Sequence, residues 1–471
     1  MPKMHILLIS PPHRNIITTT IPEKINKERG YQPPLGLLYI ASYLKQNSAH
    51  KITIIDSEVE RLDYPDLKAR IGQLKPDLVG IQALTFTLID ALKTAAVVKS
   101  YSRSIPVVFG GPHVTIYPRE TLMFEDVDYI VRGEGEISFK EMLDNFGNES
   151  GLGAVSGIGF KNNGKLTLTR DPSFIDDLNS IPFPDRTFSP YRKYYSLLSK
   201  NFPITTMMTS RGCPYNCIYC ERMGKKFRPV PAEKVLEEIE HCLSLGIREI
   251  FFHDDTFTID KKRVLTICEL INKRGLKFDW DARVRVDTVN YELLSGMKKA
   301  GCHRISFGVE SGNPRILKNL RKGITLEQVE TAFRQCRKLK IQTLADFMIG
   351  SPGESRQDIM ETISFSRRLG ADYAQFSVTT PYPGTDLYRE ALAKGVIESD
   401  VWSEFARNPK EDFIPPLWTE NLSREELIEL LNTAYKKFYL SPGFMIKELF
   451  KIGSVKELAT KMKAGLKLFK K

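Results

Sequence analysis

The sequence contains no long apolar run. None of its 471 residues falls in a stretch of about eighteen consecutive apolar side chains, which excludes a membrane-spanning helix of ordinary length. Residues 1–10 become polar too early for a secretory signal peptide, and we expect none. Hydrophobic residues still make up 42% of the chain. That content and the length are sufficient for about two or three domains with cores of their own.

Cysteine is scarce and unevenly distributed. The chain has seven cysteines, of which three lie within residues 213–220 and four stand singly. This distribution is not that of a disulfide framework, so a disulfide-stabilised secreted scaffold is excluded. The four single cysteines are expected to be small core residues: Cys242, Cys268, Cys302 and Cys336.

Positive charge is concentrated at the end of the chain. The formal net charge is +11, and residues 443–471 alone hold eight Lys and two Glu. The rest of the chain is almost balanced and has no basic patch interleaved with aromatic residues, so we expect no nucleic-acid partner. In the tail, lysines and apolar residues recur at near-helical spacing. This pattern predicts either a basic amphipathic helix at a membrane surface or a helix packed on the protein with a solvated lysine face.

The three clustered cysteines carry the clearest chemistry. Cys213, Cys217 and Cys220 have the spacing C-x3-C-x2-C, and Gly212 and Pro214 suit a tight loop. Three thiolates in one short loop can bind three irons of a 4Fe–4S cluster and leave the fourth iron open to a substrate or cofactor. A structural zinc site usually needs four ligands, and no fourth Cys or His lies nearby. We therefore expect a 4Fe–4S cluster and, with it, a reducing compartment, the cytoplasm.

The first part of the chain, residues 1–150, alternates apolar strands with helical segments. This rhythm predicts an α/β domain with a doubly wound parallel sheet, in which ligands bind beyond the carboxyl ends of the strands. No G-x-G-x-x-G follows the first strand, so nucleotide binding is a weak alternative. The residues expected at the strand ends are Ser10, Pro11, Pro12, Thr85, Gly110, Gly111, His113, Gly133 and Glu134.

The second part of the chain repeats the strand–helix rhythm. Residues 151–202 are expected to be a connector, because their glycines and prolines favour turns and extended chain. Residues 203–390 contain six strand–helix units, which predict a partial (β/α)6 barrel, and 391–471 a helical C-terminal region. Barrels of this kind place their sites at the carboxyl ends of the strands. Besides the cysteine loop, the residues expected on that rim are Asp254, Asp255, Arg285, Glu310, Gly350, Pro352 and Gly353.

The cysteine loop and the rim residues after it resemble the radical S-adenosylmethionine (SAM) superfamily. The N-terminal segments resemble the cobalamin-binding domain fused in front of many such enzymes, so the resemblance covers about residues 1–390. Its N-terminal part rests on Ser10-Pro11-Pro12, Pro33-Pro34-Leu35-Gly36, Gly110-Gly111-Pro112-His113 and Arg132-Gly133-Glu134-Gly135-Glu136. The resemblance implies that SAM chelates the open iron and that one electron then releases a 5′-deoxyadenosyl radical. It also implies an electron donor of the flavodoxin or ferredoxin type.

The resemblance further implies roles for individual residues. Asp254 and Asp255 stand where the amino group of SAM is bound, and Glu310 where its methionine or ribose is held. Arg285 is expected to pair with the carboxylate of SAM, and residues 350–354 to lie near its adenine. The strand ends of the N-terminal domain are expected to bind cobalamin.

One motif of cobalamin proteins is missing. Cobalamin mutases and methionine synthase carry D-x-H-x-x-G, whose His binds cobalt, and neither His13 nor His113 stands in such a motif. We therefore expect cobalamin to bind without a histidine ligand of that type. A domain with this fold and no cobalamin is the alternative.

The resemblance implies an enzyme that methylates an unactivated carbon. The basic tail indicates a small hydrophobic substrate, lipid or isoprenoid-like, that is met at a membrane surface. Relatives in the family also form rings or oxidise without methyl transfer, as the anaerobic magnesium-protoporphyrin ester cyclase does, and others methylate hopanoid lipids. Radical carbon–carbon coupling in lipids, without methyl transfer, is a related alternative. A non-catalytic cobalamin or redox sensor is a second hypothesis. The complete set of rim residues favours the enzyme, since a sensor would have little reason to keep them together.

Overall fold

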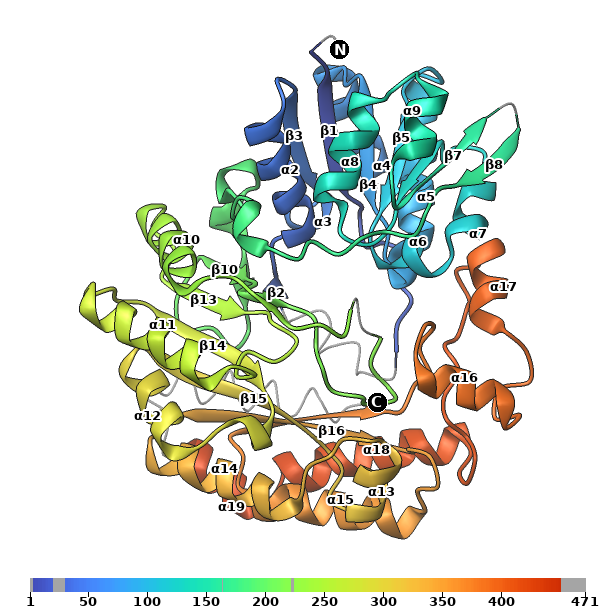
Figure 1. Ribbon diagram of the computed structural model, residues 1–471. Coiled ribbons are helices and arrows are strands. Elements are labelled where there is room, and N and C mark those ends of the chain that lie inside the picture. The colour runs from blue at the N-terminus through green and yellow to red at the C-terminus, as the bar shows by residue number, and fades with distance from the viewer. Residues whose placement is uncertain (1–2, 20–29, 163, 222–223, 450–471) are drawn as a thin grey trace.

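The computed structural model describes residues 3–19, 30–162, 164–221 and 224–449 (Figure 1). A sheet domain built from the N-terminal part of the chain lies over a partial barrel, and the cysteine loop lies between the two (Figure 1). No helix in these residues is long and apolar enough to cross a membrane.

The N-terminal domain is a seven-stranded sheet. Its first five strands in spatial order are parallel, the sixth pairs antiparallel with the fifth, and the seventh pairs antiparallel with the sixth. In that order they are β3 (Lys51–Asp56), β1 (His5–Ser10), β4 (Leu78–Gln82), β5 (Val107–Gly110), β6 (Tyr129–Val131), β7 (Ile158–Asn162) and β8 (Lys165–Leu168). The direction of strand order reverses between β1 and β4, and ligands of such sheets bind at that point, beyond the carboxyl ends of the strands.

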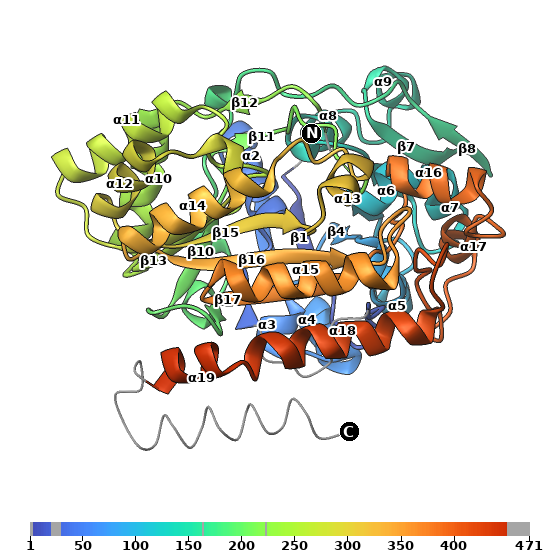
Figure 2. The same cartoon turned by 90° about the horizontal axis from the view of Figure 1, so that it is seen from below.

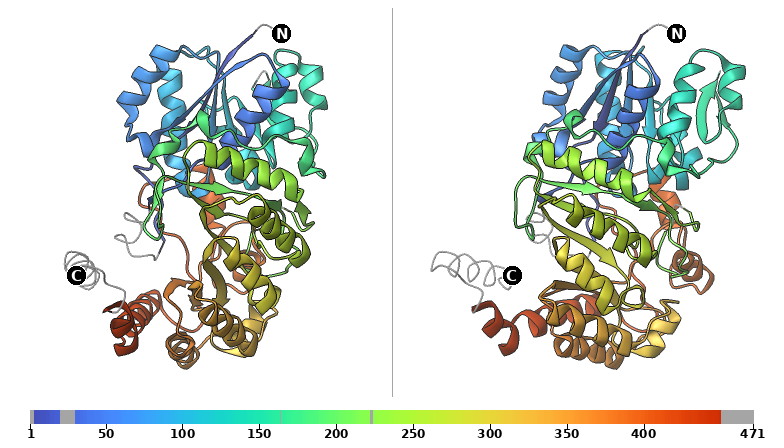
Figure 3. Two further views of the ribbon diagram at one scale, coloured as in Figure 1. Left: turned by 90° about the vertical axis from the view of Figure 1, so that its left-hand side faces the viewer. Right: turned by 60° about the vertical axis from the view of Figure 1, so that its left-hand side comes forward.

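Helices cover both faces of this sheet, as the side views in Figure 3 show. On one face, α2 (Leu35–Asn47) and α8 (Gly135–Asp144) pack against Ile6 and Leu8 of β1. On the other, α4 (Tyr64–Leu74) and α5 (Leu88–Tyr101) pack against Leu7 and Ile9. Because successive strand residues point to opposite faces, an unbroken apolar run such as β1 indicates burial on both. The predicted doubly wound sheet is confirmed.

The sheet continues past residue 150, into the segment expected to be a connector. The hairpin of β7 and β8 pairs Asn162 with Lys165 and lies antiparallel beside β6. The strands on either side of the expected turn therefore belong to the sheet. Short elements around the sheet are α3 (Ser57–Glu60), α6 (Pro112–Ile116), α7 (Pro118–Met123) and α9 (Glu149–Ala154).

The predicted partial (β/α)6 barrel is also confirmed. Its six strands are parallel and follow chain order: β10 (Ile204–Met207), β13 (Glu249–Phe252), β14 (Asp279–Val284), β15 (Cys302–Glu310), β16 (Gln342–Ile349) and β17 (Tyr373–Val378). The connecting helices are α10 (Ala232–Ser244), α11 (Lys261–Lys273), α12 (Tyr291–Lys299), α13 (Pro314–Asn319), α14 (Leu326–Lys338) and α15 (Arg356–Leu369). Two-residue ribbons join β2 (Gly30–Tyr31) to β9 (Tyr195–Ser196) and β11 (Ser210–Arg211) to β12 (Arg228–Pro229).

The C-terminal helices brace the open side of the barrel. The helix α18 (Arg424–Tyr439) runs along β17 (Figure 2), and its Tyr435 hydroxyl accepts from the amide of Phe376 at 3.2 Å and donates to its carbonyl at 2.9 Å. Tyr439 makes the same pair of bonds with Ala374. These tyrosines satisfy backbone groups that an edge strand would otherwise expose. The remaining helices are α16 (Asp386–Ala393), α17 (Val401–Arg407) and α19 (Pro442–Leu449). Residues 450–471, most of the basic tail, lie outside the described residues.

Candidate functional site

Asp254 anchors the segment that leads into the cysteine loop. One carboxylate oxygen accepts from the amide of Thr209 at 2.6 Å, and the other from the hydroxyls of Thr209 and Ser210 at 2.7 and 2.5 Å. Burial raises the pKa of this carboxyl, although these donors oppose the shift. Asp254 therefore holds the backbone just before Cys213, and a direct contact with SAM stays a prediction.

The cysteine loop requires glycine at residue 212. Gly212 has φ +84°, and a Cβ there would lie 2.2 Å from the carbonyl oxygen of Lys226. The loop presents three free thiols, with Cys217 buried, Cys213 partly buried and Cys220 exposed. Among the described residues no three His, Cys, Asp or Glu side chains are close enough to hold one metal ion. The three free thiols on one loop fit a 4Fe–4S cluster, in which each cysteine ligates a different iron.

A cation lies directly beside the buried thiol. The Arg285 guanidinium is 3.7 Å from the Cys217 sulfur, and its central carbon is 3.7 Å from the ring centroid of Tyr215. Asp287 accepts from two of its nitrogens at 3.0 and 2.9 Å. The positive charge of Arg285 would thus stabilise a thiolate at Cys217. Its expected pairing with the carboxylate of SAM stays a prediction.

Glu310 lies at an irregular point of the barrel. It has φ +67°, and the pairing of β15 with β16 shifts register between Gly308 and Glu310. Its carboxylate accepts from the hydroxyl of Tyr219 at 3.0 Å and from the ammonium of Lys322 at 2.8 Å. Tyr219 belongs to the cysteine loop, so Glu310 and Lys322 support that loop from the barrel side. Nothing in the sequence around Lys322 indicates this role, because its partners are distant in the chain.

The other expected rim residues divide between two places. The Asp255 side chain lines the cavity described below, and burial raises its pKa against the charge of Arg283. Gly350 and Gly353 have φ values of +72° and +71° in the loop after β16, which also contains Pro352. In that loop Glu354 accepts from the amide of Ser351 at 2.8 Å, and burial raises the pKa of its carboxyl to about 8.

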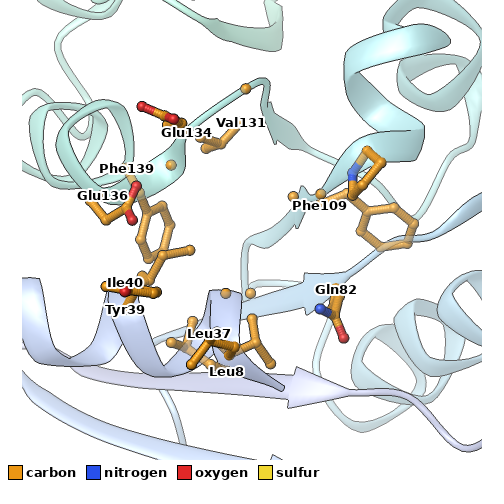
Figure 4. Close-up of a pocket in the computed structure, with 18 of the residues that line it drawn as sticks. Leu8, Leu37, Tyr39, Ile40, Gln82, Phe109, Val131, Glu134, Glu136 and Phe139 are labelled. Atoms are coloured by element: carbon orange, nitrogen blue, oxygen red, sulfur yellow. The ribbon is translucent and has the colours of Figure 1, made fainter. Parts of the chain in front are cut away.

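A cavity of about 350 Å³ separates the carboxyl edge of the N-terminal sheet from the cysteine loop. Its deep part is apolar, with Leu8, Leu37, Ile40 and Phe139 facing inward (Figure 4). On the other side it is bounded by Ser210, Arg211 and Gly212, the residues directly before Cys213. One cavity therefore touches both the strand ends of the sheet and the base of the cysteine loop.

Glycines give this cavity its width. A Cβ on Gly110 would meet nothing closer than the Val131 carbonyl oxygen at 3.8 Å, so that strand end faces open space. Of the residues expected at the strand ends, Gly110, Gly111, Gly133 and Glu134 line the cavity. The others are not among its lining residues: Ser10, Pro11, Pro12, Thr85 and His113.

His113 lies apart from the cavity in a buried position. Its Nδ1 is 3.1 Å from the hydroxyl of Thr85, and its Nε2 has no hydrogen-bond partner among the described residues. Burial lowers the pKa of His113 to about 3, so the ring is neutral near neutral pH.

Buried ion pairs connect the two sides of the cavity. Arg211 lies 2.6 Å from Glu136 and 3.6 Å from Glu134, and Arg228 lies 2.7 Å from Glu134. The Arg211 guanidinium also lies over the ring of Tyr39, 4.8 Å from its centroid. Burial disfavours the charged form of Glu134, but the bonds from Arg228 and the charge of Arg211 outweigh it and lower its pKa. Glu134 was expected at a strand end, whereas Arg211, Arg228 and Tyr39 were not among the expected site residues.

Two family models match the chain. The Radical SAM superfamily matches residues 207–366, and the B12 binding domain matches residues 25–143. An uncharacterised methyltransferase from Pyrococcus horikoshii is 37% identical over 96% of this chain and 95% of its own length. An anaerobic magnesium-protoporphyrin IX monomethyl ester cyclase from Rubrivivax gelatinosus is 29% identical over 88% of this chain and 75% of its own.

Solved structures show the same fold. The radical SAM methyltransferase TsrM from Kitasatospora setae, solved with cobalamin and a 4Fe–4S cluster, superposes with a TM-score of 0.73 at 15% sequence identity. The superposition covers 94% of this chain and 90% of that one. It therefore includes both the sheet domain and the barrel.

Proposed function

This chain belongs to the radical SAM superfamily and carries a B12-binding domain in front of its radical SAM domain, and we infer that it transfers a methyl group to an unactivated carbon. The observation that carries this inference is the cavity shared by the two domains. Its lining includes Gly110 and Gly133 of the B12-binding domain and Arg211 and Gly212 of the cysteine loop. A relative covering nearly the whole chain is also a methyltransferase by name.

The residues present fit the cofactors of this class. Cys213, Cys217 and Cys220 would hold the 4Fe–4S cluster, with Asp255, Arg285 and Glu310 beside it as candidate SAM contacts. The apolar cavity with its glycine-lined wall would hold part of cobalamin. When bound, the cluster supplies the electron that cleaves SAM to an adenosyl radical, and cobalamin supplies a carrier for the methyl group.

The chain's own residues position and shield these groups. Asp254 fixes the backbone before Cys213, and Lys322 and Glu310 hold Tyr219 within the loop. The Arg211 pairs fix the loop's base against the B12-binding domain. Such rigid support limits the movement of reacting groups, which is the main contribution a protein makes around reactive cofactors.

The substrate is proposed to be small and hydrophobic, with a lipid or isoprenoid-like molecule as first choice. The support is the tail, residues 443–471, whose lysines and apolar residues suit an anionic membrane surface. The test is liposome flotation of the full chain and of a truncation after Pro442. If the intact protein stays off anionic vesicles at low salt, or if truncation leaves flotation unchanged, the support for a lipid substrate is lost.

Methyl transfer is tested with the full chain, reconstituted anaerobically with iron, sulfide and cobalamin. With SAM and a flavodoxin or ferredoxin type reductant we expect 5′-deoxyadenosine and S-adenosylhomocysteine, both measured by mass spectrometry. Cys217→Ala should form no 5′-deoxyadenosine, and Cys336→Ala, a buried core thiol, should behave as wild type. Growth of the source cells on methyl-deuterated methionine, with and without the gene, would reveal the product by its added mass.

The same measurements separate the alternatives. 5′-Deoxyadenosine without S-adenosylhomocysteine would support ring formation, oxidation or carbon–carbon coupling without methyl transfer. Cobalamin and cluster binding with neither product would support a sensor.

A further inference from the structure

The inside of the barrel contains a second cavity, of about 150 Å³. Every strand of the barrel contributes at least one side chain to its lining. In contrast to the cavity under the N-terminal sheet, this one is polar and charged. Because alternate residues of a strand point the same way, Asp281, Arg283 and Arg285 succeed one another on the inner side of β14 and its end. Asp281 defines the lowest level of the barrel interior, Arg283 the middle level and Arg285 the highest level.

At the lowest level the charged side chains make ion pairs and hydrogen bonds within the protein. Arg304 forms an ion pair with Asp281 and donates to the carbonyl of Leu198. Glu249 accepts from the amides of Lys200 and Asn201 at 2.7 and 2.6 Å. The connector thereby closes the bottom of the barrel, and these charges are compensated.

At the highest level the charges serve the cysteine loop. Arg285 pairs with Asp287 and touches the Cys217 sulfur, and Lys322 pairs with Glu310. Each of these groups has a partner of opposite charge.

The middle level differs from both. Arg283 lies over the ring of Phe251, 5.4 Å from its centroid, and Asp346 stands on β16 across the cavity. In the described part of the chain, neither the guanidinium nor the carboxylate makes a hydrogen bond or an ion pair. The Arg283 side chain is exposed and therefore open to water and ligands, whereas Asp346 is half-buried, where a charge without a partner is unfavourable for folding. Such a pair is expected where a ligand completes the site.

The middle level is also close to the reaction centre. Arg283 precedes Arg285 by two residues on the same strand face, a step of about 7 Å. Since Arg285 touches Cys217, a molecule held by Arg283 lies one step below the cysteine loop. It lies beneath the rim where the candidate SAM contacts are found.

We propose that Arg283 and Asp346 form the polar end of the substrate site. Arg283 binds an oxyanion of the substrate, a carboxylate or a phosphate, and Asp346 accepts a hydrogen bond from a hydroxyl or amine of the same molecule. This rests on the proposed function, because a radical formed at the cysteine loop would act on a substrate held in the barrel directly beneath that loop. An oxyanion at one end agrees with the apolar body proposed above, so the substrate class is an anionic amphiphile. The planar guanidinium suits both kinds of oxyanion.

The test measures binding of short probes to the reconstituted full chain by calorimetry and does not depend on turnover. The probes are hexyl phosphate, hexanoate, hexanol and hexylamine, which share one alkyl chain and differ in the head group. We expect hexyl phosphate or hexanoate to bind more tightly than hexanol and hexylamine. Whichever of these two probes binds more tightly shows whether the site prefers a phosphate or a carboxylate.

Variants assign the binding to the residues. Arg283→Gln should weaken binding of the preferred anion by about tenfold or more, and Arg283→Lys should restore part of it. Arg334→Gln, on the exposed side of α14, is the matched control and should change nothing. Asp346→Asn should not weaken binding of the anionic probe, because the substitution removes a negative charge near Arg283.

Three outcomes would overturn the proposal. In the first, the anion binds Arg283→Gln as it binds wild type. In the second, the neutral or cationic probe binds as tightly as the anions. In the third, Arg283→Gln weakens SAM binding but not the anionic probes, which would assign Arg283 to the carboxylate of SAM. Cluster absorbance, recorded for each variant, shows whether the fold is retained. Absence of methyl transfer would refute the proposed function and leave these binding results unaffected.

Discussion

The guanidinium of Arg211 lies 2.6 Å from the carboxylate of Glu136, and this contact joins the cysteine loop to the B12-binding domain. Both side chains are buried, at 11% and 5% exposure. Arg211 lines the shared cavity and is two residues from Cys213. It would therefore lie next to both a group in the cavity and a cluster on the loop. The ion pair gives the two cofactor sites a common structural support.

Arg211→Met is therefore expected to destabilise both sites. It leaves the Glu136 carboxylate buried without its cation, a change that costs about 3 kcal/mol in comparable pairs. Anaerobic urea denaturation of the reconstituted protein measures the loss, and gel filtration measures retention of cobalamin. The control is Arg103→Met, whose side chain is 69% exposed and whose pair with Glu125 should contribute under about 1 kcal/mol. Equal stability losses in the two variants would contradict this role for Arg211.

Gly110→Leu is expected to abolish cobalamin binding and leave the cluster in place. The new side chain has open space before it, since the nearest atom to its Cβ is 3.8 Å away, and it would occupy the cavity. Cobalamin absorbance after gel filtration and iron content report the two cofactors separately. Gly153→Leu, at a position with nothing within 4 Å and outside the cavity, is the matched control. Normal cobalamin content in Gly110→Leu would show that cobalamin binds elsewhere.

The Co(II) form of the bound cobalamin should show no histidine nitrogen in its electron paramagnetic resonance spectrum. No histidine lines the cavity in the described residues, and His113 is buried apart from it, against Thr85. His113→Ala should leave the spectrum unchanged while lowering stability, because it removes a buried ring and leaves a void. Nitrogen splitting that disappears in His113→Ala would refute this expectation.

Asp346→Asn is expected to stabilise the protein above neutral pH. Partial burial, followed by the charge of Glu310, raises the pKa of Asp346 to about 7, although Arg283 and Lys322 oppose the shift. A carboxyl whose folded pKa is raised contributes stability below its unfolded pKa, and this contribution is lost as the pH rises through the folded value. The variant should thus gain about 1–3 kcal/mol over wild type at pH 8, and less at pH 5.5.

Thermal unfolding of the two proteins between pH 5.5 and 8.5 measures this gain. Asp412→Asn, at an exposed position, is the control and should show no pH-dependent gain. A gain that is the same at every pH would mean that ionisation of Asp346 is not its source. Stabilisation by removing a polar group is typical of a residue kept for binding.

The sequence alone determined both sheets and the cysteine site. Strand and helix periods are local properties, so the alternation in residues 1–150 and 203–390 predicted two parallel sheets correctly. The C-x3-C-x2-C spacing is equally local, since all three thiols belong to one loop. The sheet hairpin of β7 and β8 was recognised as a turn but not as part of the sheet, because pairing with β6 is a long-range contact.

Only the tertiary structure decided what individual side chains do. Asp254 and Asp255 are chemically identical neighbours. The carboxylate of Asp254 accepts hydrogen bonds from Thr209 and Ser210, whereas Asp255 lines the cavity. Arg211, Arg283, Lys322 and Asp346 carry no local signal at all. Their roles depend on whether a partner of opposite charge lies within reach, and that depends on residues tens to hundreds of positions away. Whether a charge is paired depends on which residues lie near it in three dimensions. The sequence therefore indicated the cofactors, whereas the tertiary structure was needed to find the polar end of the proposed substrate site.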